Sequence, residues 1–244
     1  MRCLGRCDGG TLGAMPDRKS SRSERTAAKR EQILDTAMRK FSEHGYLGTK
    51  VESIADELGI AKGSIFQHFG SKSGLFFETY KRAVTSLPAW LDAPPKVLEK
   101  GFFEIVDYWL RRTEHLVRED YVPYRVVLIG EFGTDDLALK RDILRFMVSE
   151  DPYGTLDFVE YGIRRREVRD DIDMELIVSM VDWMSGGLQD ALVTEERDPG
   201  LFHRWRHQPE RQKIRIEQFE ILLRSAIGTA AVREAAVPAP IAAN

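Results

Sequence analysis

Residues 49–72 read TKVESIADELGIAKGSIFQHFGSK, and this stretch decides the fold. Thr49 and Glu52 have the T-x-x-E spacing of a capping box, in which two side chains satisfy free backbone N–H groups at a helix start. Apolar residues then recur at the i, i+3, i+4, i+7 spacing of a helix that buries one stripe. Gly59 can adopt the left-handed conformation that ends such a helix. The stretch therefore predicts two short helices joined by a tight turn, which is the layout of a helix-turn-helix.

The second of these helices, expected from about Lys62, has two chemically different sides. At 100° per residue, Ile65 and Phe69 share an apolar side, and small polar residues lie roughly opposite. In a helix-turn-helix the second helix lies in the major groove, where its outward residues meet base edges. We therefore expect Ser64 and Gln67 to read bases, while basic neighbours hold phosphate.

Several features of residues 33–76 occur together in one family. They are an aromatic residue after Gly45, Thr49, an Ile-Ala pair at 54–55, and the run from Gly63 to Lys72. On these features, the chain from Arg30 to about Lys81 resembles the tetracycline-repressor (TetR) family of bacterial regulators. The chain departs from the family at two places, with Ala61 where serine is usual and Phe66 where tyrosine is usual. The loss of the tyrosine hydroxyl leaves open whether Phe66 touches phosphate or only packs.

The resemblance implies a homodimer that binds double-stranded DNA at a palindromic operator. It also implies three N-terminal helices for DNA and a larger helical half for a small-molecule effector. A helical hairpin inside a core is the plain alternative for the 49–72 segment, and a structural hydrogen bond is the alternative for His68. By position, the implied DNA contacts are Thr49, Lys50, Lys62, Gly63, Ser64, Phe66, Gln67, His68 and Lys72.

The composition predicts a soluble cytoplasmic protein. The chain has 244 residues, of which 43% are hydrophobic and 31% are charged. No apolar run approaches the ~20 residues that a helix needs to cross a bilayer, so we expect no membrane partner. Cys3 and Cys7 are the two cysteines, too few and too close to the start to form a disulfide framework. Without a second ligand pair, this C-x-x-x-C spacing predicts no metal site.

Charge is distributed unevenly along the chain. Residues 18–82 contain thirteen Lys and Arg against eight Asp and Glu, a net charge of +5, whereas residues 83–244 contain twenty-one against twenty-nine, a net charge of −8. The basic part coincides with the predicted DNA-binding helices. The basic run before the first helix can add salt-dependent affinity for phosphate, or it can be an ordinary solvated tail.

Helical periodicity dominates the whole chain and predicts an all-α protein. Residues 1–25 are expected to be a disordered basic tail, and residues 26–71 a helix-turn-helix DNA-binding domain. Residues 72–231 are expected to form a helical ligand-binding and dimerisation domain, followed by a disordered tail at 232–244. Ser71 is the expected N-cap of a fourth helix that reaches toward Trp90 and connects the two domains. Further helices are expected at about 96–117, 123–129, 134–148, 151–166, 174–195 and 209–230.

The last two long helices carry apolar stripes. The resemblance implies that they pair with their copies in a four-helix bundle. The alternative is that the stripes complete the core of a single protomer. The residues expected at the dimer interface are Ile177, Val181, Ser185, Leu188, Ile216, Phe219, Leu223 and Ile227.

The effector site is the least determined part of the sequence. Asp107, Glu131 and Asp182 stand among apolar neighbours, and a buried carboxylate needs a partner. That partner can be an arginine of the same chain, solvent at an exposed face, or a cationic or hydroxylated ligand. Aromatic residues at helical spacing can equally be core. The candidate lining residues are Trp90, Phe103, Asp107, Leu110, Glu131, Phe132, Phe146, Met147, Phe158, Tyr161, Trp183 and Met184.

The sequence contains no catalytic or cofactor-binding motif. It has neither an H-E-x-x-H nor a G-x-S-x-G arrangement, and no phosphate-binding glycine loop. We therefore expect no enzyme and no cofactor, but a DNA-binding transcriptional regulator that responds to a ligand. The most direct form is a repressor released from a palindromic operator by a small, largely apolar or aromatic molecule. The alternative is a helical small-molecule-binding protein or enzyme whose DNA-binding head is vestigial.

Overall fold

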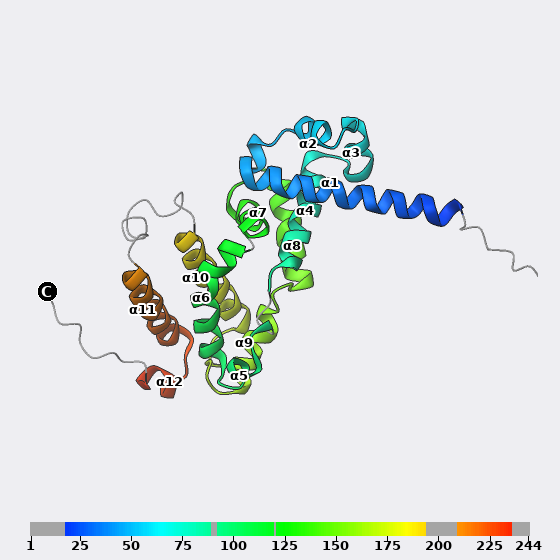
Figure 1. Ribbon diagram of the computed structural model, residues 1–244. Helices are drawn as coiled ribbons and strands as arrows, with labels where there is room; N and C mark the ends of the chain where they lie inside the picture. Colours follow the sequence, from blue (N-terminus) through cyan, green and yellow to red (C-terminus); the bar gives the residue numbers. More distant parts are fainter. Residues whose placement is uncertain (1–17, 89–91, 120, 194–208, 236–244) are drawn as a thin grey trace, which may run out of the picture.

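The computed structural model describes residues 18–88, 92–119, 121–193 and 209–235. Within these ranges the chain forms twelve helices, and its β structure is a single isolated bridge between Val168 and Gly228. The predicted all-α fold is confirmed (Figure 1). The helices are α1 (Arg18–Gly48), α2 (Val51–Glu57), α3 (Lys62–Phe69), α4 (Lys72–Ser86), α5 (Pro95–Leu98), α6 (Phe102–Glu119), α7 (Tyr121–Phe132), α8 (Leu137–Glu150), α9 (Thr155–Arg164), α10 (Met174–Val193), α11 (Pro209–Ile227) and α12 (Ala230–Ala235).

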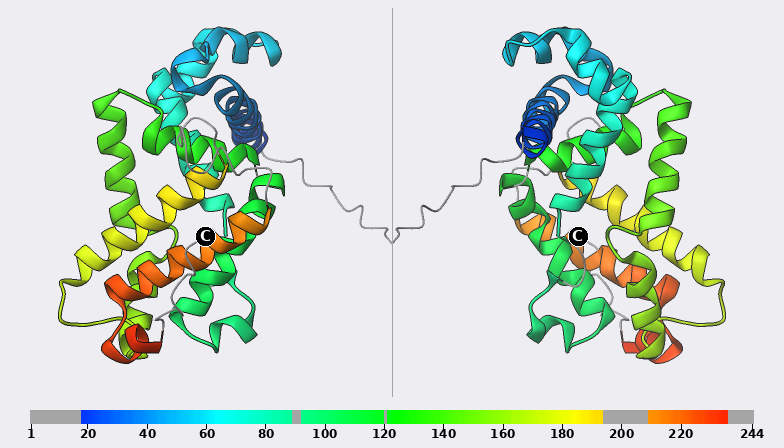
Figure 2. Two further views of the ribbon diagram at one scale, coloured as in Figure 1. Left: turned by 90° about the vertical axis from the view of Figure 1, so that its left-hand side faces the viewer. Right: turned by 90° about the vertical axis from the view of Figure 1, so that its right-hand side faces the viewer.

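Helices α1, α2 and α3 form a head at one end of the molecule, and α12 lies at the other end (Figure 2). The long α1 passes beneath α2 and α3 and projects beyond them at its N-terminal end (Figure 1). Its main kink is at Gly45, where φ is 70° and ψ is 174°. This backbone conformation is open to glycine at no steric cost, and it turns the chain toward α2.

The turn between α2 and α3 is built as the sequence predicts. Gly59 has a φ of 61°, and its N–H donates to the carbonyl of Asp56 at 3.2 Å. The N–H of Ile60 donates to the carbonyl of Ala55 at 3.0 Å. These two bonds are those of a Schellman motif, which satisfies the last carbonyls of a helix and reverses the chain. The motif fixes the angle at which α3 leaves α2.

The predicted capping box at Thr49 is wrong. Helix α2 begins at Val51, and Lys50 occupies the N-cap position without a side-chain cap. The buried Thr49 hydroxyl donates instead to the carbonyls of Lys40 at 2.9 Å and Gly45 at 2.7 Å. Thr49 therefore ties the end of α1 to the start of α2, because the kink at Gly45 brings these two carbonyls within reach of its hydroxyl.

Local signals set the start of several other helices. The Ser71 hydroxyl accepts a hydrogen bond from the N–H of Gly74 at 3.0 Å, so the predicted cap of α4 is confirmed. Asp136 caps α8, and the Asp151 carboxylate accepts from the first N–H groups of α9. The single helix expected at 96–117 is divided into α5 and α6 at Gly101, where φ is 123°.

One hydrophobic cluster, which we call cluster 1, joins the head to the following helices. It contains buried residues of α1 to α4, such as Phe41 and Phe76, together with buried residues of α7 and α8, such as Ile129. The rings of Phe41 and Phe76 meet edge to face at 4.8 Å. This core crosses the domain boundary expected at residue 71.

A second hydrophobic cluster, cluster 2, is formed by α6, α9, α10 and α11. Phe102 and Phe158 stack in it with their centroids 4.2 Å apart, and Ile177 and Leu223 are fully buried there. Cluster 2 contains no residue of the three-helix head.

Both expected tails are shorter in the structure. Residues 18–25, expected to be disordered, are the first turns of α1, and residues 232–235 belong to α12. Residues 1–17 and 236–244 lie outside the described residues. None of the described helices is long and apolar enough to cross a membrane.

Candidate nucleic-acid interface

Helix α3 presents the two sides that its sequence predicts. Ile65 and Phe69 are buried against cluster 1. Gly63 and Gln67 are exposed, and Ser64 is half-buried beside them. A Cβ placed on Gly63 would meet nothing within 4 Å, so the surface there is open to a close partner. This side of α3 has the donors, acceptors and clearance that base edges in a major groove require.

The first residues of α3 are electrostatically tied to α2. The Lys62 ammonium forms an ion pair with the Glu52 carboxylate, and it also lies 5.2 Å from the centre of the Phe66 ring. Phe66 is half-buried and packs against cluster 1. The two lysine contacts are at the surface, where ion pairs are weak, so Lys62 can turn to a phosphate at small cost.

Lys72, at the start of α4, is held in place by the turn after α1. Its ammonium donates to the carbonyl of Leu47 at 3.2 Å and lies 4.9 Å from the centre of the Tyr46 ring. Burial lowers the pKa of Lys72 from its ordinary value, and the Glu52 carboxylate opposes that change. The half-buried position orients a single positive charge, as a phosphate contact needs.

The remaining predicted DNA contacts differ in accessibility. Lys50 is exposed, and His68 is half-buried with its ring 6.1 Å from that of Phe69. Thr49 is buried, and its hydroxyl is used within the protein. Thr49 is therefore corrected from a DNA contact to a structural tie.

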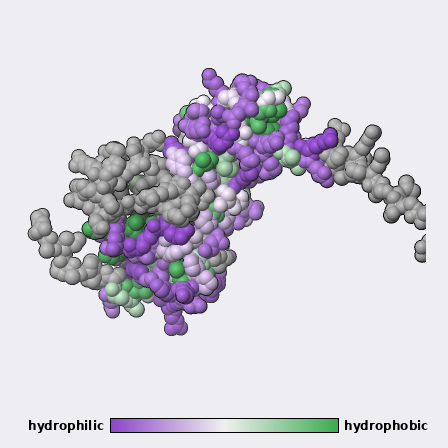
Figure 3. Space-filling model, in the orientation of Figure 1, coloured by the Kyte–Doolittle hydropathy of each residue, from purple (hydrophilic) through white to green (hydrophobic). Residues whose placement is uncertain are grey.

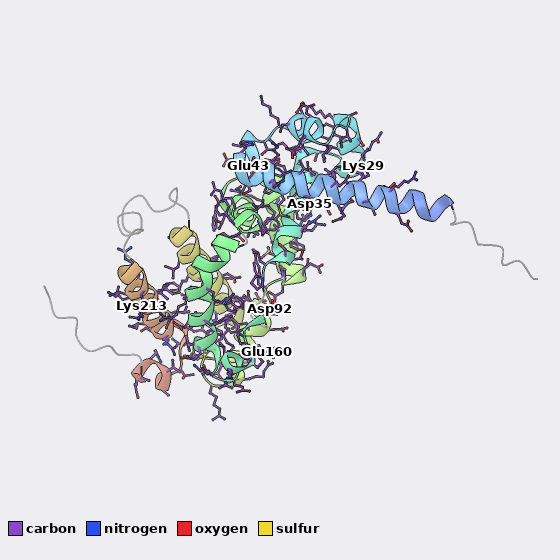
Figure 4. All side chains as sticks on the ribbon, in the orientation of Figure 1. Lys29, Asp35, Glu43, Asp92, Glu160 and Lys213 are labelled. Carbon is purple, nitrogen blue, oxygen red and sulfur yellow. The ribbon has the colours of Figure 1, made fainter. Side chains whose placement is uncertain are left out.

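The surface of the head is polar and its charges also hold it together. On the face shown in Figure 3, hydrophilic residues cover most of the head and the projecting part of α1. Figure 4 marks Lys29, Asp35 and Glu43 in order along α1. Arg82 of α4 pairs with Asp35 at 2.7 Å and also with Glu31, so part of the charge on α1 fixes it to α4.

A hydrogen bond connects the head to the larger half. The Tyr46 hydroxyl donates to Oδ2 of Asp136 at 3.2 Å. The other oxygen of Asp136 accepts from the N–H groups of Ala138 and Leu139, both at 3.1 Å, and so caps α8. Lys72, a predicted phosphate contact, lies over the ring of Tyr46. Tyr46 therefore contacts both Lys72 and Asp136, the residue that caps α8.

The structure does not bring the predicted effector-lining residues to one place. Trp90 lies outside the described residues. Glu131 is half-buried on α7, whereas Phe132 and Trp183 have 44% and 70% of their surface exposed. Asp107 pairs with Arg111 on the same helix, which is the internal partner that the sequence left open. The others divide between the clusters, with Phe146 and Met147 at cluster 1 and Phe103, Leu110, Phe158, Tyr161 and Met184 in or against cluster 2.

Sequence reasoning missed other polar side chains of the larger half. Burial raises the pKa of Tyr153 well above its ordinary value, and the charges of Glu131, Tyr80, Tyr124 and Asp182 raise it further. The tyrosines stand within ordinary helical or loop sequence, and their nearness depends on how α4, α7 and α10 pack.

The predicted dimer stripe lies inside the protomer. Six of its members are at most 7% exposed and belong to cluster 2, so a partner cannot reach them, and Ser185 and Phe219 are half-buried. For these six residues the structure favours the alternative core, whereas Ser185 and Phe219 stay predicted interface residues. The six are Ile177, Val181, Leu188, Ile216, Leu223 and Ile227.

Comparison with known proteins agrees with the helical head. Residues 33–79 match the family model for bacterial regulatory proteins of the tetR family. The chain is 44% identical over 173 residues to the HTH-type transcriptional repressor Rv1474c of Mycobacterium tuberculosis, covering 71% of this chain and 86% of that protein. It is 25% identical over 166 residues to the HTH-type transcriptional repressor AcnR of Corynebacterium diphtheriae, covering 68% of this chain and 82% of that protein.

A solved structure extends the likeness to the whole fold. The TylP protein, a tetR regulator from Streptomyces fradiae, superposes with a TM-score of 0.55 at 18% identity. The superposition covers 88% of this chain and 92% of TylP. At this identity the likeness concerns the arrangement of helices alone.

Proposed function

The chain belongs to the tetR family of bacterial regulatory proteins and is a transcriptional repressor of that family; from this premise we propose that it binds a palindromic operator as a homodimer and is released by a small effector. One observation carries the DNA-binding part. The Schellman turn at Gly59 holds α3 so that Gly63 and Gln67 face outward while Ile65 and Phe69 are buried. This is the geometry in which a short helix reads a major groove.

Footprinting of the full-length protein on genomic fragments tests this proposal. Two symmetric half-sites, spaced by about one helical turn or slightly more, are the expected result, because a dimer presents two copies of α3. A footprint over a single half-site would contradict the dimer. Failure to retain any fragment at moderate salt would contradict DNA binding.

The exposed apolar residues of α10 and α11 support a second copy of the chain as partner. Trp183 and Leu222 are 70% and 62% exposed, and Leu176 and Ile214 are 47% and 49% exposed. A Cβ on Gly187 would meet nothing within 4 Å, which leaves room for a partner helix to approach α10 closely. Exposed apolar residues gathered on two helices are typical of an interface.

Charge substitution on this face tests dimer formation. We expect Trp183→Lys combined with Leu222→Lys to give a monomer in sedimentation velocity, since a buried charge opposes association. Leu137→Lys is the matched control, because Leu137 is 68% exposed on α8. A double variant that stays dimeric, or a control that becomes monomeric, would place the interface elsewhere.

The proposed effector is a small molecule with a largely apolar or aromatic skeleton. It regulates only by binding the DNA-competent and DNA-incompetent states with different affinity. A ~100-fold loss of operator affinity requires roughly 2.7 kcal/mol of coupling, and operator must weaken effector binding by the same factor.

A further inference from the structure

The N-terminal part of α1 projects beyond the three-helix head. Residues 24–28 are all exposed, and α1 becomes buried only from Ile33 onward. In Figure 1 this part of α1 extends away from the side of the molecule on which α10 and α11 lie. At a rise of 1.5 Å per residue, residues 18–29 extend the head by roughly 18 Å. The projecting helix therefore offers a surface that the fold itself does not cover.

Positively charged residues recur on one side of this projecting helix. They follow one another at intervals of four, three and four residues. At 100° per residue these intervals place them within about 60° of one another around α1, and they place Glu24 and Glu31 on the far side. We call this line the basic stripe. Its members are Arg18, Arg22, Arg25 and Lys29.

Two members of the basic stripe have free charges. Arg25 is exposed and Lys29 is half-buried, and neither makes a hydrogen bond or an ion pair within the described ranges of the chain. The next cation along α1 differs, because Arg30 pairs with Glu78 of α4. The packed part of α1 thus uses its cations to hold the fold, whereas the projecting part carries positive charge that the protein does not compensate.

The basic stripe leaves the head on the side of the DNA-binding helices. Continued by steps of three or four residues, the same line of α1 passes through Ile33 and Lys40. Lys40 pairs with Glu57 of α2 at 3.0 Å, so this line faces α2. Arg30, one residue after the stripe, lies 5.2 Å from the centre of the Phe69 ring at the end of α3. The stripe therefore starts beside the end of α3 and continues away from it.

A row of positive charges in this position fits the phosphates of a duplex. Double-stranded DNA carries one negative charge per ~1.7 Å of its axis, and cations that neutralise phosphates add affinity for any sequence. The stripe is about 16 Å long, which is the length of about five base pairs at 3.4 Å each. The Arg25 and Lys29 charges can bind phosphate without first breaking an ion pair.

We propose that the basic stripe binds backbone phosphates of the DNA that flanks each operator half-site. This inference rests on the proposed function, to which it adds a second DNA contact outside α3. Since the stripe extends away from α10 and α11, which carry the proposed dimer face, the two stripes of a dimer lie on the outer flanks of the two half-sites (Figure 1). A contact of this kind adds affinity without changing the preference for bases.

Neutralising the two free charges tests the proposal. Arg25→Gln combined with Lys29→Gln removes two charges from each protomer and keeps residues that favour a helix. The loss of four phosphate contacts per dimer should lower the slope of log K against log [KCl] by about 3–4. Affinity at 150 mM KCl should fall about tenfold or more, for operator and shuffled duplexes alike. Fluorescence anisotropy with the full-length protein measures both quantities.

Two further variants separate charge from structure. Lys96→Gln combined with Arg233→Gln is the matched control, because these exposed cations lie on α5 and α12, at the end of the molecule opposite the head (Figure 1). It removes the same charge and should leave the slope and the affinity unchanged. Arg25→Lys combined with Lys29→Arg keeps both charges and should bind like the wild type.

The length of the duplex tests where the stripe binds. Adding about six base pairs to each end of a duplex that holds only the two half-sites covers the length of the stripe. This extension should raise the affinity of the wild type several-fold and leave that of Arg25→Gln/Lys29→Gln unchanged. Equal gains for both proteins would contradict a contact between the stripe and the flanking DNA.

An unchanged salt slope in Arg25→Gln/Lys29→Gln would overturn the proposal and assign the stripe to solvent or to an acidic protein. Equal losses in the matched control, or in the variant that keeps both charges, would overturn it as well. The wild type is titrated with operator in the same series. Normal operator binding together with any of these results rejects the flanking contact alone, whereas a wild type that binds no DNA contradicts the proposed function itself.

Discussion

Clusters 1 and 2 differ in what they join. Cluster 1 unites the three DNA-binding helices with α4, α7 and α8, whereas cluster 2 unites α6 and α9 with the helices that carry the proposed dimer face. A rearrangement near α7 therefore reaches the head through shared packing. The helices of the proposed dimer face belong to the other core, so in the proposed dimer a movement of one cluster against the other would change the spacing of the two heads without unfolding either cluster.

The largest expected effect comes from removing a fully buried phenylalanine from one cluster or the other. Phe76 is fully buried in cluster 1 and Phe102 is fully buried in cluster 2. Replacing either by alanine should lower the free energy of unfolding by about 3–5 kcal/mol, as measured by urea denaturation. At a temperature where both variants are folded, Phe76→Ala should weaken operator binding and Phe102→Ala should not. Equal losses of operator affinity would show that the cores do not act separately.

A smaller effect is a pH dependence of the free energy of unfolding, which we expect from Glu220 on α11, a helix of cluster 2. Burial and the neighbouring Asp107 carboxylate raise the pKa of Glu220 to about 8, against the opposing charges of Arg111 and Arg224. A raised pKa in the folded state favours the protonated form, so the stability it contributes is complete below about pH 4.5 and is lost as pH rises through about 8. After allowance for solvent at this half-buried site, the loss is roughly 1–2 kcal/mol.

Glu220→Gln should remove this decline, because glutamine cannot ionise. The measurement is the free energy of unfolding between pH 5 and pH 8.5, with Glu160→Gln on the exposed side of α9 as control. An unchanged decline in Glu220→Gln would assign the pH dependence to other groups.

The smallest effect concerns the tie between the head and α8. Tyr46→Phe removes the hydrogen bond to Asp136 but keeps the ring beside those of Phe41 and Phe76. We expect a loss of about 0.5–1.5 kcal/mol in the free energy of unfolding. Operator affinity should also weaken slightly, since Lys72 rests on the same ring. A loss of stability larger than that of Phe76→Ala would contradict the view that this side chain contributes only one hydrogen bond between the head and α8.

Local signals explain why the head was predictable from the sequence. Gly59 and Ser71 act on backbone groups within a few residues of themselves, so their roles can be inferred without the fold. Thr49 has the sequence spacing of an N-cap residue, but its hydroxyl does not cap α2. It donates instead to two carbonyls of α1. The capping-box prediction was wrong because the kink at Gly45, which the sequence pattern alone does not reveal, places these carbonyls beside Thr49.

The larger half was harder to predict because helical periodicity shows which side of a helix is buried but not which part of the structure buries it. Ile177 and Leu223 have the spacing of buried residues, but the sequence cannot distinguish a core from an interface. Tyr153 lies outside any helix, and its neighbours are brought near by packing alone. The effector-lining residues stay a prediction, because periodicity alone does not separate pocket walls from core, and most of these aromatic residues lie in or against the two clusters.

The preference of the protein for its own operator over a shuffled sequence tests the central claim most directly. Competition anisotropy measures this ratio for the wild type, Gln67→Ala and Lys72→Ala. Gln67→Ala should lower the ratio by an amount equivalent to about 1–3 kcal/mol while affinity for shuffled DNA stays the same. Lys72→Ala should lower both affinities together and leave the ratio unchanged. An unchanged ratio in Gln67→Ala would contradict the reading of bases by the exposed side of α3.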